Sequence, residues 1–506
     1  MFTRTITRLA LAGGIAFATS HAEAARLTPP DDLKAFMAQV ETASAIADPY
    51  QRCLHMPDPP GSHWHADSVE AYCRFGNENT LDARQFRALI AAGQGARVDK
   101  AFASYTHAQL HDPAHPARLD AAIRRTGLRN ASKATRSVID EWMRQRPDSA
   151  FAVAASAIQY GTASLEARGS NASSQTSQRQ FDAMHAISLQ AREAFDRAAA
   201  MNPRIPTLYA YMYATGVILD DPSYANAALA KGLALQPNGF VLRLVHENMG
   251  GAKWGGSTAD EVRQGTEAQD LASKTPLLRV VASRALLAAL TDEMTHPPAH
   301  DEISVVPEVT HSDDLSNLAE FAWRAGHYDR ALILAVEALR FESSNDQALY
   351  QVAKIAPSYG YTRWMRTTLA AAANDHPESV DVARIAGGML SLYGDVATSE
   401  PLLKSVLVER PYDVWATDQL AALYAHEGKR PDEALRLVDD LIDYHPEDGW
   451  PQVIRARLLI AANDPRRYDA IKHFIIQFAQ DEAFRTEVNE LATYLNEHPA
   501  TPRATG

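Results

Sequence analysis

The sequence contains only two cysteines in 506 residues, and it lacks several patterns on which catalysis and membrane insertion depend. Beyond the first 25 residues, no run approaches the ~18 consecutive apolar residues that a membrane helix needs. No G-x-S-x-G nucleophile elbow, H-E-x-x-H zinc helix or C-x-x-C redox motif occurs. We therefore expect a protein that is not an enzyme, holds no cofactor or metal, and has no membrane span.

Positive charge is also scarce, because 49 Lys and Arg residues face 62 Asp and Glu residues and leave a formal charge of -13. Such a balance repels phosphate backbones, so nucleic acid is not an expected partner. Hydrophobic residues make up 46% of the chain, enough for a large core. Alanine is abundant and runs of β-branched residues are rare, which favours helices over strands.

The chain opens with the features of a secretory signal peptide. Arg4 and Arg8 precede an apolar run at 9–18, and the small-residue sequence Ala22-Glu23-Ala24 follows. This order predicts cleavage near Ala25, and the run is too short to span a bilayer. We expect a signal peptide at 1–24 and an exported protein, either periplasmic or secreted further. A buried first helix is the alternative reading.

A repeat of constant length runs through the C-terminal half. Gly326, Gly360, Gly394 and Gly428 are evenly spaced, and Pro377, Pro411 and Pro446 keep nearly the same interval. The interval, about 34 residues, is long enough for a helix–turn–helix unit. A helix, a glycine that permits a left-handed turn, a second helix and a terminating proline would produce this pattern. The period therefore predicts a stack of helical hairpins.

The segment Gly326-His327-Tyr328-Asp329-Arg330-Ala331 resembles the G-x-Y-x-x-A turn of the tetratricopeptide repeat. The resemblance covers copies at 312–345, 346–379, 380–413 and 414–448, with a looser fifth copy at 449–482. Met365 and Ser399 stand where the repeat prefers alanine, so two copies are degenerate. The resemblance implies an all-α solenoid of helical hairpins. Before it we expect an N-terminal helical segment closed by a disulfide, for the reasons given below.

A weaker repeat with the same period lies upstream, where Pro203 and Pro237 are separated by the same interval as the glycines. A Ser-rich polar insertion at 168–180 and the glycine-rich stretch 249–257 accompany it. Together they resemble the bacterial domain of unknown function family 4034 over 146–276, a family that implies no activity. The expected division is an N-terminal segment at 25–140, a degenerate repeat domain at 141–294, a linker at 295–311, the array at 312–490 and a tail at 491–506.

Both cysteines lie in the short stretch from Arg52 to Cys73. In an exported chain we expect a Cys53–Cys73 disulfide, whose loop would stabilise the fold by roughly 3 kcal/mol on the chain-entropy estimate. Zinc is the alternative, because His55, His63 and His65 lie in the same stretch and complete a Cys2His2-like set. Free thiols are the third reading.

In tetratricopeptide arrays the first helix of each hairpin faces a concave groove that binds ligands. Carried over by register, the resemblance implies these groove residues: Glu320, Trp323, Arg324, Gln347, Tyr350, Lys354, Asp381, Arg384, Trp415, Asp418 and His426. Aromatic anchors beside charges suit a peptide-binding surface. We expect a scaffold that binds a protein or peptide. The alternatives are a metal-dependent or hydrolytic activity at the Cys/His segment, and a self-associating structural part of an envelope complex.

Overall fold

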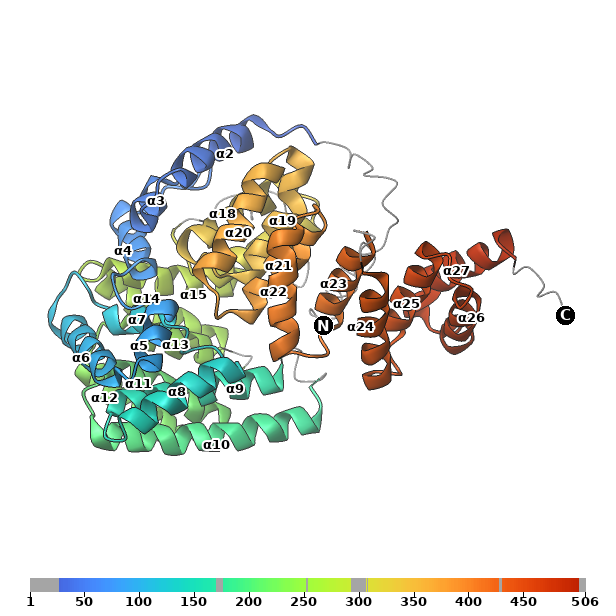
Figure 1. Cartoon of the computed structure of the whole chain (residues 1–506). Coiled ribbons are helices and arrows are strands. Elements are labelled where there is room, and N and C mark those ends of the chain that lie inside the picture. The colour runs from blue at the N-terminus through green and yellow to red at the C-terminus, as the bar shows by residue number, and fades with distance from the viewer. Residues whose placement is uncertain are drawn as a thin grey trace. The chain divides into compact units, whose positions relative to one another are not determined.

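The computed structural model describes residues 27–169, 176–251, 254–292, 306, 308–426 and 430–499. Every regular element in these ranges is a helix (Figure 1), and within them none is long and apolar enough to cross a membrane. The predicted all-α class is therefore confirmed. The predicted signal peptide lies outside the described residues.

The chain forms two compact units, Arg26–Val382 and a second that begins at Ala383 and runs to the C-terminus. The boundary falls inside helix α21 (Val380–Ser391). It does not coincide with the linker expected at 295–311, so the predicted array contributes helices to both units.

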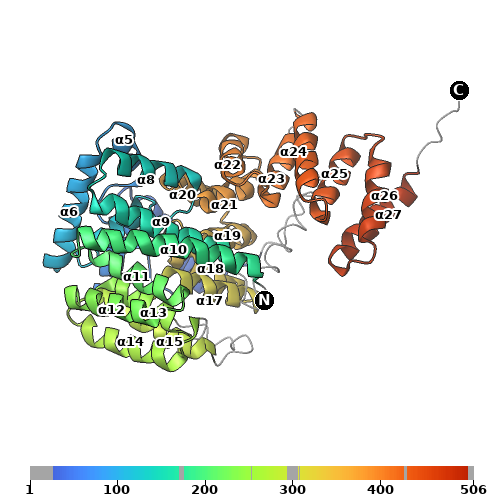
Figure 2. The same ribbon diagram turned by 90° about the horizontal axis from the view of Figure 1, so that it is seen from below.

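The first unit opens with a series of short helices and continues with longer ones. The helices of its N-terminal part are α2 (Asp31–Ser44), α3 (Pro49–His55), α4 (Ala66–Gly76), α5 (Ala83–Ala91), α6 (Gly95–His111), α7 (Arg118–Arg125) and α8 (Lys133–Gln145). The next are α9 (Ala150–Arg168), α10 (Gln178–Met201), α11 (Pro206–Ile218), α12 (Pro222–Leu235), α13 (Phe240–Gly250), α14 (Thr258–Ala272), η3 (Pro276–Leu278) and α15 (Arg279–Asp292). Consecutive helices pack as hairpins, among them α9 with α10 (Figure 2) and α11 with α12.

Local sequence explains several of these helix starts. The Asp82 carboxylate accepts a hydrogen bond from the backbone N–H of Gln85, and the side-chain oxygen of Gln85 accepts one from the backbone N–H of Asp82. Ser177 and Gln180 form the same capping box. Each box satisfies two backbone donors that a helix start leaves without partners. Trp142 packs edge-on against Phe86 and Phe102 with ring centroids 5.5 and 5.4 Å away, at the centre of the core of this part.

The predicted hairpin period is present in the structure. The array helices of the first unit are α17 (Ser312–Arg324), α18 (Tyr328–Phe341), α19 (Asp346–Ile355), η4 (Ala356–Tyr359), α20 (Thr362–Asp375) and the start of α21. Gly326 and Gly360 take left-handed φ angles of 86° and 89° between paired helices, as the repeat requires. Gly428 lies outside the described residues. Upstream, the starts of α11 and α13 are separated by the same interval as the glycines. The weaker upstream repeat is therefore also built of helical hairpins.

The disulfide-closed segment lies against α18. The ring of Tyr72 stacks on Phe341 with centroids 4.5 Å apart, and Arg340 donates to the Cys53 carbonyl at 2.9 Å and to Asp58 at 2.8 Å. Arg340 also pairs with the fully buried Glu337 at 3.1 Å. This cover explains why most of α18 is buried, including its outward positions.

Part of the expected linker also packs in this region. The indole nitrogen of Trp64 donates to the Val306 carbonyl at 2.9 Å, and Val309 and Thr310 are fully buried. Residues 306 and 308–311 thus have a packing role, although the Pro-rich, acidic composition of 295–311 predicted a linker.

The second unit continues the hairpins after the end of α21. Its helices are α22 (Val396–Glu409), α23 (Val414–His426), α24 (Pro431–Tyr444), α25 (Gly449–Ala461), α26 (Arg467–Phe478), η5 (Glu482–Phe484) and α27 (Arg485–Glu497). Helix α27 extends past the array end predicted at 490. Its residue Leu491 is buried, so the helix packs beyond that point.

Candidate functional site

The groove residues implied on α17 and α19 come together in the first unit. The ammonium nitrogen of Lys354 lies 3.0 Å from the ring centroid of Trp323 and 5.6 Å from that of Tyr350. All three side chains are half-buried. A cation held over two aromatic faces is attracted by their negative quadrupoles, so the two helices share one small aromatic and cationic surface.

Polar groups border this surface. Arg324 donates from Nε to Glu320 at 2.7 Å, and Gln351 donates to the second Glu320 oxygen at 3.4 Å. Gln347 donates to the Ser316 carbonyl at 3.3 Å, and so its amide is already oriented. The two glutamine bonds connect α17 with α19, the first helices of successive hairpins. We call Glu320, Trp323, Arg324, Gln347, Tyr350 and Lys354 the α17/α19 surface.

The charge of Lys354 is sensitive to this environment. The pKa of its amine is lowered to about 8, chiefly by burial; Glu320 acts in the opposite direction, and the nearby cation Arg324 adds to the lowering. Removing water from an ammonium disfavours the charged form. The amine therefore changes its charge close to physiological pH, which an exposed lysine does not do.

The implied groove residues further along the array behave differently. Asp381 is exposed at the start of α21. In the second unit, Arg384 donates to the Asp413 carboxylate at 2.9 Å and its guanidinium lies 4.7 Å from the Trp415 ring centroid. The side chain of His426 lies outside the described residues.

Trp415 and Asp418 are packed inside the second unit and do not form an open surface. Trp415 is 5% exposed, and its ring occupies the space where a side chain at Gly388 would stand. Asp418 is 2% exposed, and burial raises the pKa of its carboxyl to about 7 although Arg457 and Gln419 act to lower it. Because Gly388 has no side chain, the indole of Trp415 fits against its backbone. The repeat register did not predict this contact.

The Cys/His segment forms a disulfide. Cys53 and Cys73 are bonded with Cα atoms 5.7 Å apart, which confirms that prediction. Neither cysteine is then available as a thiolate ligand. His55 contacts the Gln51 carbonyl through Nδ1, His65 pairs with Glu308, and His63 is exposed. Across the described ranges, no three His, Cys, Asp or Glu side chains gather as a metal site of that size would require.

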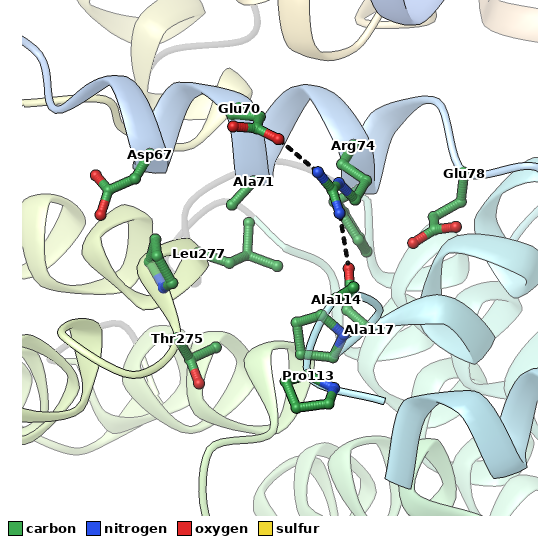
Figure 3. A pocket seen from close by; sticks show the side chains of 13 residues that line it. Asp67, Glu70, Ala71, Arg74, Glu78, Pro113, Ala114, Ala117, Thr275 and Leu277 are labelled. Atoms are coloured by element: carbon green, nitrogen blue, oxygen red, sulfur yellow. Dashed lines mark hydrogen bonds and ion pairs between the residues drawn. The ribbon is translucent and has the colours of Figure 1, made fainter. Parts of the chain in front are cut away.

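A pocket of about 200 Å³ opens beside the disulfide segment (Figure 3). It lies between α4, the loop at 113–117 and the turn at 275–277, with Phe75 and Leu277 among its apolar lining. Arg74 pairs with Glu70 on the same helix, and it donates to the Ala114 carbonyl in the loop at 113–117. Sequence analysis missed this pocket, because its three walls are remote in sequence and none carries a motif.

The carboxylates of the pocket are compensated by cations. Asp67 pairs with Arg279 at 2.8 Å and Glu78 pairs with Arg118 at 3.8 Å, while the imidazole of His115 lies 2.7 Å from Glu78. The lining contains no histidine, cysteine or serine. Its lining combines carboxylates, a guanidinium and apolar groups, so the pocket offers shape and balanced charge.

No profile of a known protein family matches the chain. The resemblance of 146–276 to domain of unknown function family 4034 thus stays a prediction. A stretch of 68 residues is 37% identical to cellulose synthase operon protein C of Xanthomonas axonopodis pv. citri (strain 306). That stretch spans 13% of this chain and 4% of the relative.

Two solved structures align with the chain at low sequence identity. Yeast Tom70 aligns over 92% of this chain and 95% of its own, with 12% identity and a TM-score of 0.33. The TPR domain of P58(IPK) aligns over 62% of this chain and 95% of its own, with 13% identity and a TM-score of 0.19. The assignment as a tetratricopeptide-like solenoid rests on the hairpin period, the turn glycines and the paired helices of this chain.

Proposed function

We propose that this protein is a scaffold that binds a protein or peptide partner through the first helices of its tetratricopeptide-like array. The observation that supports this most directly is the α17/α19 surface, where Trp323 and Tyr350 flank Lys354. Helical-hairpin arrays present extended surfaces of this kind to polypeptides.

The chemistry of the α17/α19 surface suits a polypeptide. Aromatic side chains supply contact area at low entropic cost, and neighbouring charges set the register of the bound chain. Trp323 and Tyr350 are half-buried and held by neighbours, so little ordering is needed when a partner binds. Glu320 and Arg324 satisfy each other, leaving a polar border around an aromatic centre.

The proposal includes export and an envelope location. It is supported by the signal-like N-terminus and by the disulfide, since disulfides persist in oxidising compartments. The matching relative is named for a cellulose synthase operon, and we extend the proposal to an assembly of the cell envelope. We include a periplasmic location in the proposal.

Site-specific photo-crosslinking tests the proposal. A photo-reactive amino acid at Gln347 samples the α17/α19 surface, and the same group at Leu189 on α10, which is 44% exposed, samples a remote position. Crosslinking is done in cells that make the protein natively, and adducts are identified by mass spectrometry. We expect a specific polypeptide adduct from position 347 and none from position 189.

Trp323→Ala combined with Tyr350→Ala should abolish the adduct at 347 while the circular dichroism spectrum is retained, because neither side chain is part of the deep core. Equal crosslinking from 347 and 189, or an adduct that survives the double substitution, would contradict the proposal. An adduct with a second copy of this chain would support the self-associating alternative instead.

A further inference from the structure

Two histidines on helix α6 form a pair that no part of the proposed function uses. His107 and His111 are exposed, and their ring centroids lie 4.7 Å apart with 53° between the ring planes. Residues four apart on a helix occupy the same face, one turn above the other. Among the described residues, neither imidazole has a hydrogen bond or ion pair within the chain.

The separation of the two rings fits the chelation of one ion. An imidazole nitrogen binds zinc at about 2.0–2.1 Å, which places the ring centre about 3.2 Å from the metal. Two such rings at bond angles between a right angle and a tetrahedral angle have centres about 4.5 to 5.2 Å apart. The observed 4.7 Å lies inside this interval.

Helix α6 holds the pair in place from its other side. Val98, Phe102, Thr106 and Gln109 are buried and fix the rotation of the helix about its axis. Gln109 also donates to Asp120 at 3.0 Å and to Gln236 at 3.1 Å, which anchors the last turn before His111. The two histidines thus stand on a rigid element, and binding an ion requires only small side-chain rotations.

We propose that His107 and His111 form a two-imidazole site for a divalent transition-metal ion. Imidazole pairs at this spacing bind zinc in helical metal sites, and they suit copper and nickel as well. The site supplies two ligands, since no third His, Cys, Asp or Glu joins them within the described residues. Water or a ligand from a partner completes the coordination. Affinity follows the usual order, with copper bound more tightly than nickel or zinc.

The test measures metal binding to the full chain, prepared without a polyhistidine tag. Isothermal titration with Zn²⁺ and with Cu²⁺ is compared between the native protein and an exchange variant, Ser104→His with His107→Ser. The exchange keeps the number of histidines and places the pair seven residues apart, about 10 Å along the helix, too far to share one ion. Ser104 is exposed like His107, so the fold should not change.

We expect the native chain to bind one equivalent of either ion about tenfold or more tightly than the exchange variant. His107→Ala and His111→Ala should each weaken binding to the same extent, whereas His473→Ala, an exposed histidine on α26, should leave it unchanged. Copper bound to the native chain should show two nitrogen ligands by electron paramagnetic resonance. Equal affinity of the native and exchange proteins, with equal melting temperatures, would overturn the proposal.

Discussion

At the scale of single residues, Lys354 is the side chain whose behaviour depends most on its neighbours. The repeat register placed it on a ligand-facing position, and the structure adds two aromatic rings around its amine. The rings come from α17 and α19, with α18 between them in the chain. The repeat register predicted that both helices face the groove, but it did not predict the distances between their side chains. Trp415 and Asp418 had the same kind of register support and are buried.

The lowered pKa of Lys354 predicts unusual reactivity. With a pKa of about 8, about half of the amines are neutral at pH 8, so acylation of Lys354 should rise with a midpoint near that pH. Peptide mapping after brief acylation between pH 6 and 10 measures this midpoint. Trp323→Ala should shift the pH midpoint of Lys354 acylation. The midpoint of Lys472, which is exposed on α26, is measured in the same digest for comparison.

The same shift has a consequence for stability. Between about pH 8 and 10.5 the unfolded chain binds more protons at Lys354 than the folded chain does, so this residue makes the unfolding free energy rise with pH across that window. Lys354→Met should remove that increment from the pH profile. An acylation midpoint for Lys354 no lower than that for Lys472 would contradict both expectations.

At the scale of elements, the hairpin turn shows how far the sequence pattern reaches. The spacing of Gly326, Gly360 and Gly394 predicted the turns, and all three have positive φ. The reason is local: a residue after a helix end must enter the left-handed region, and glycine does so without steric cost. This requirement does not depend on tertiary neighbours, so the helices and turns of the array could be predicted from the sequence.

Two glycines offer opposite stability effects from the same substitution. A Cβ at Gly326 meets no neighbour within 4 Å, so Gly326→Ala should cost only the strain of the left-handed conformation, about 1 kcal/mol. Gly161 lies inside α9 and also has open space, so Gly161→Ala should stabilise by about 0.5–1 kcal/mol through helix propensity. Urea unfolding of both variants measures the contrast, and a common sign would be inconsistent with this account.

The disulfide belongs to the same scale, because it joins α3 to α4. Replacing both Cys53 and Cys73 by alanine should lower the unfolding free energy by about 3 kcal/mol for a loop of this length. Because Tyr72 on α4 stacks on Phe341, amide hydrogens in the middle of α18 should also exchange faster. Hydrogen exchange with mass spectrometry reads this effect, with α9 as the internal reference. Unchanged exchange in α18 would show that the cover does not depend on the crosslink.

At the scale of the whole molecule, the chain forms two compact units whose boundary lies within the predicted array. A repeat contacts mainly its neighbours, so hairpins with the same sequence period can belong to different units. Within the first unit, the N-terminal segment packs on α18, where Arg340 donates to Cys53 and Asp58. Contacts between residues so distant along the chain leave no periodic signal.

Export can be tested on the whole chain. When the protein is produced in a Gram-negative bacterium, the form recovered from the periplasm should begin at Ala25 by N-terminal sequencing. Ala24→Asp places a charge at the cleavage site and should block processing, whereas Thr28→Asp, four residues downstream, should be processed normally. Recovery of an uncleaved native chain from the cytoplasm would contradict export.

The helical class, the hairpin period, the turn positions and the cysteine pairing followed from the amino-acid order, because each depends on interactions between residues close along the chain. The pocket beside Arg74, the cover over α18, the burial of Trp415 and the aromatic setting of Lys354 came only from tertiary structure. Each of these depends on which distant side chains fill the space between helices. That filling is set by packing density and by the volumes of all neighbours together, and a repeat register specifies neither.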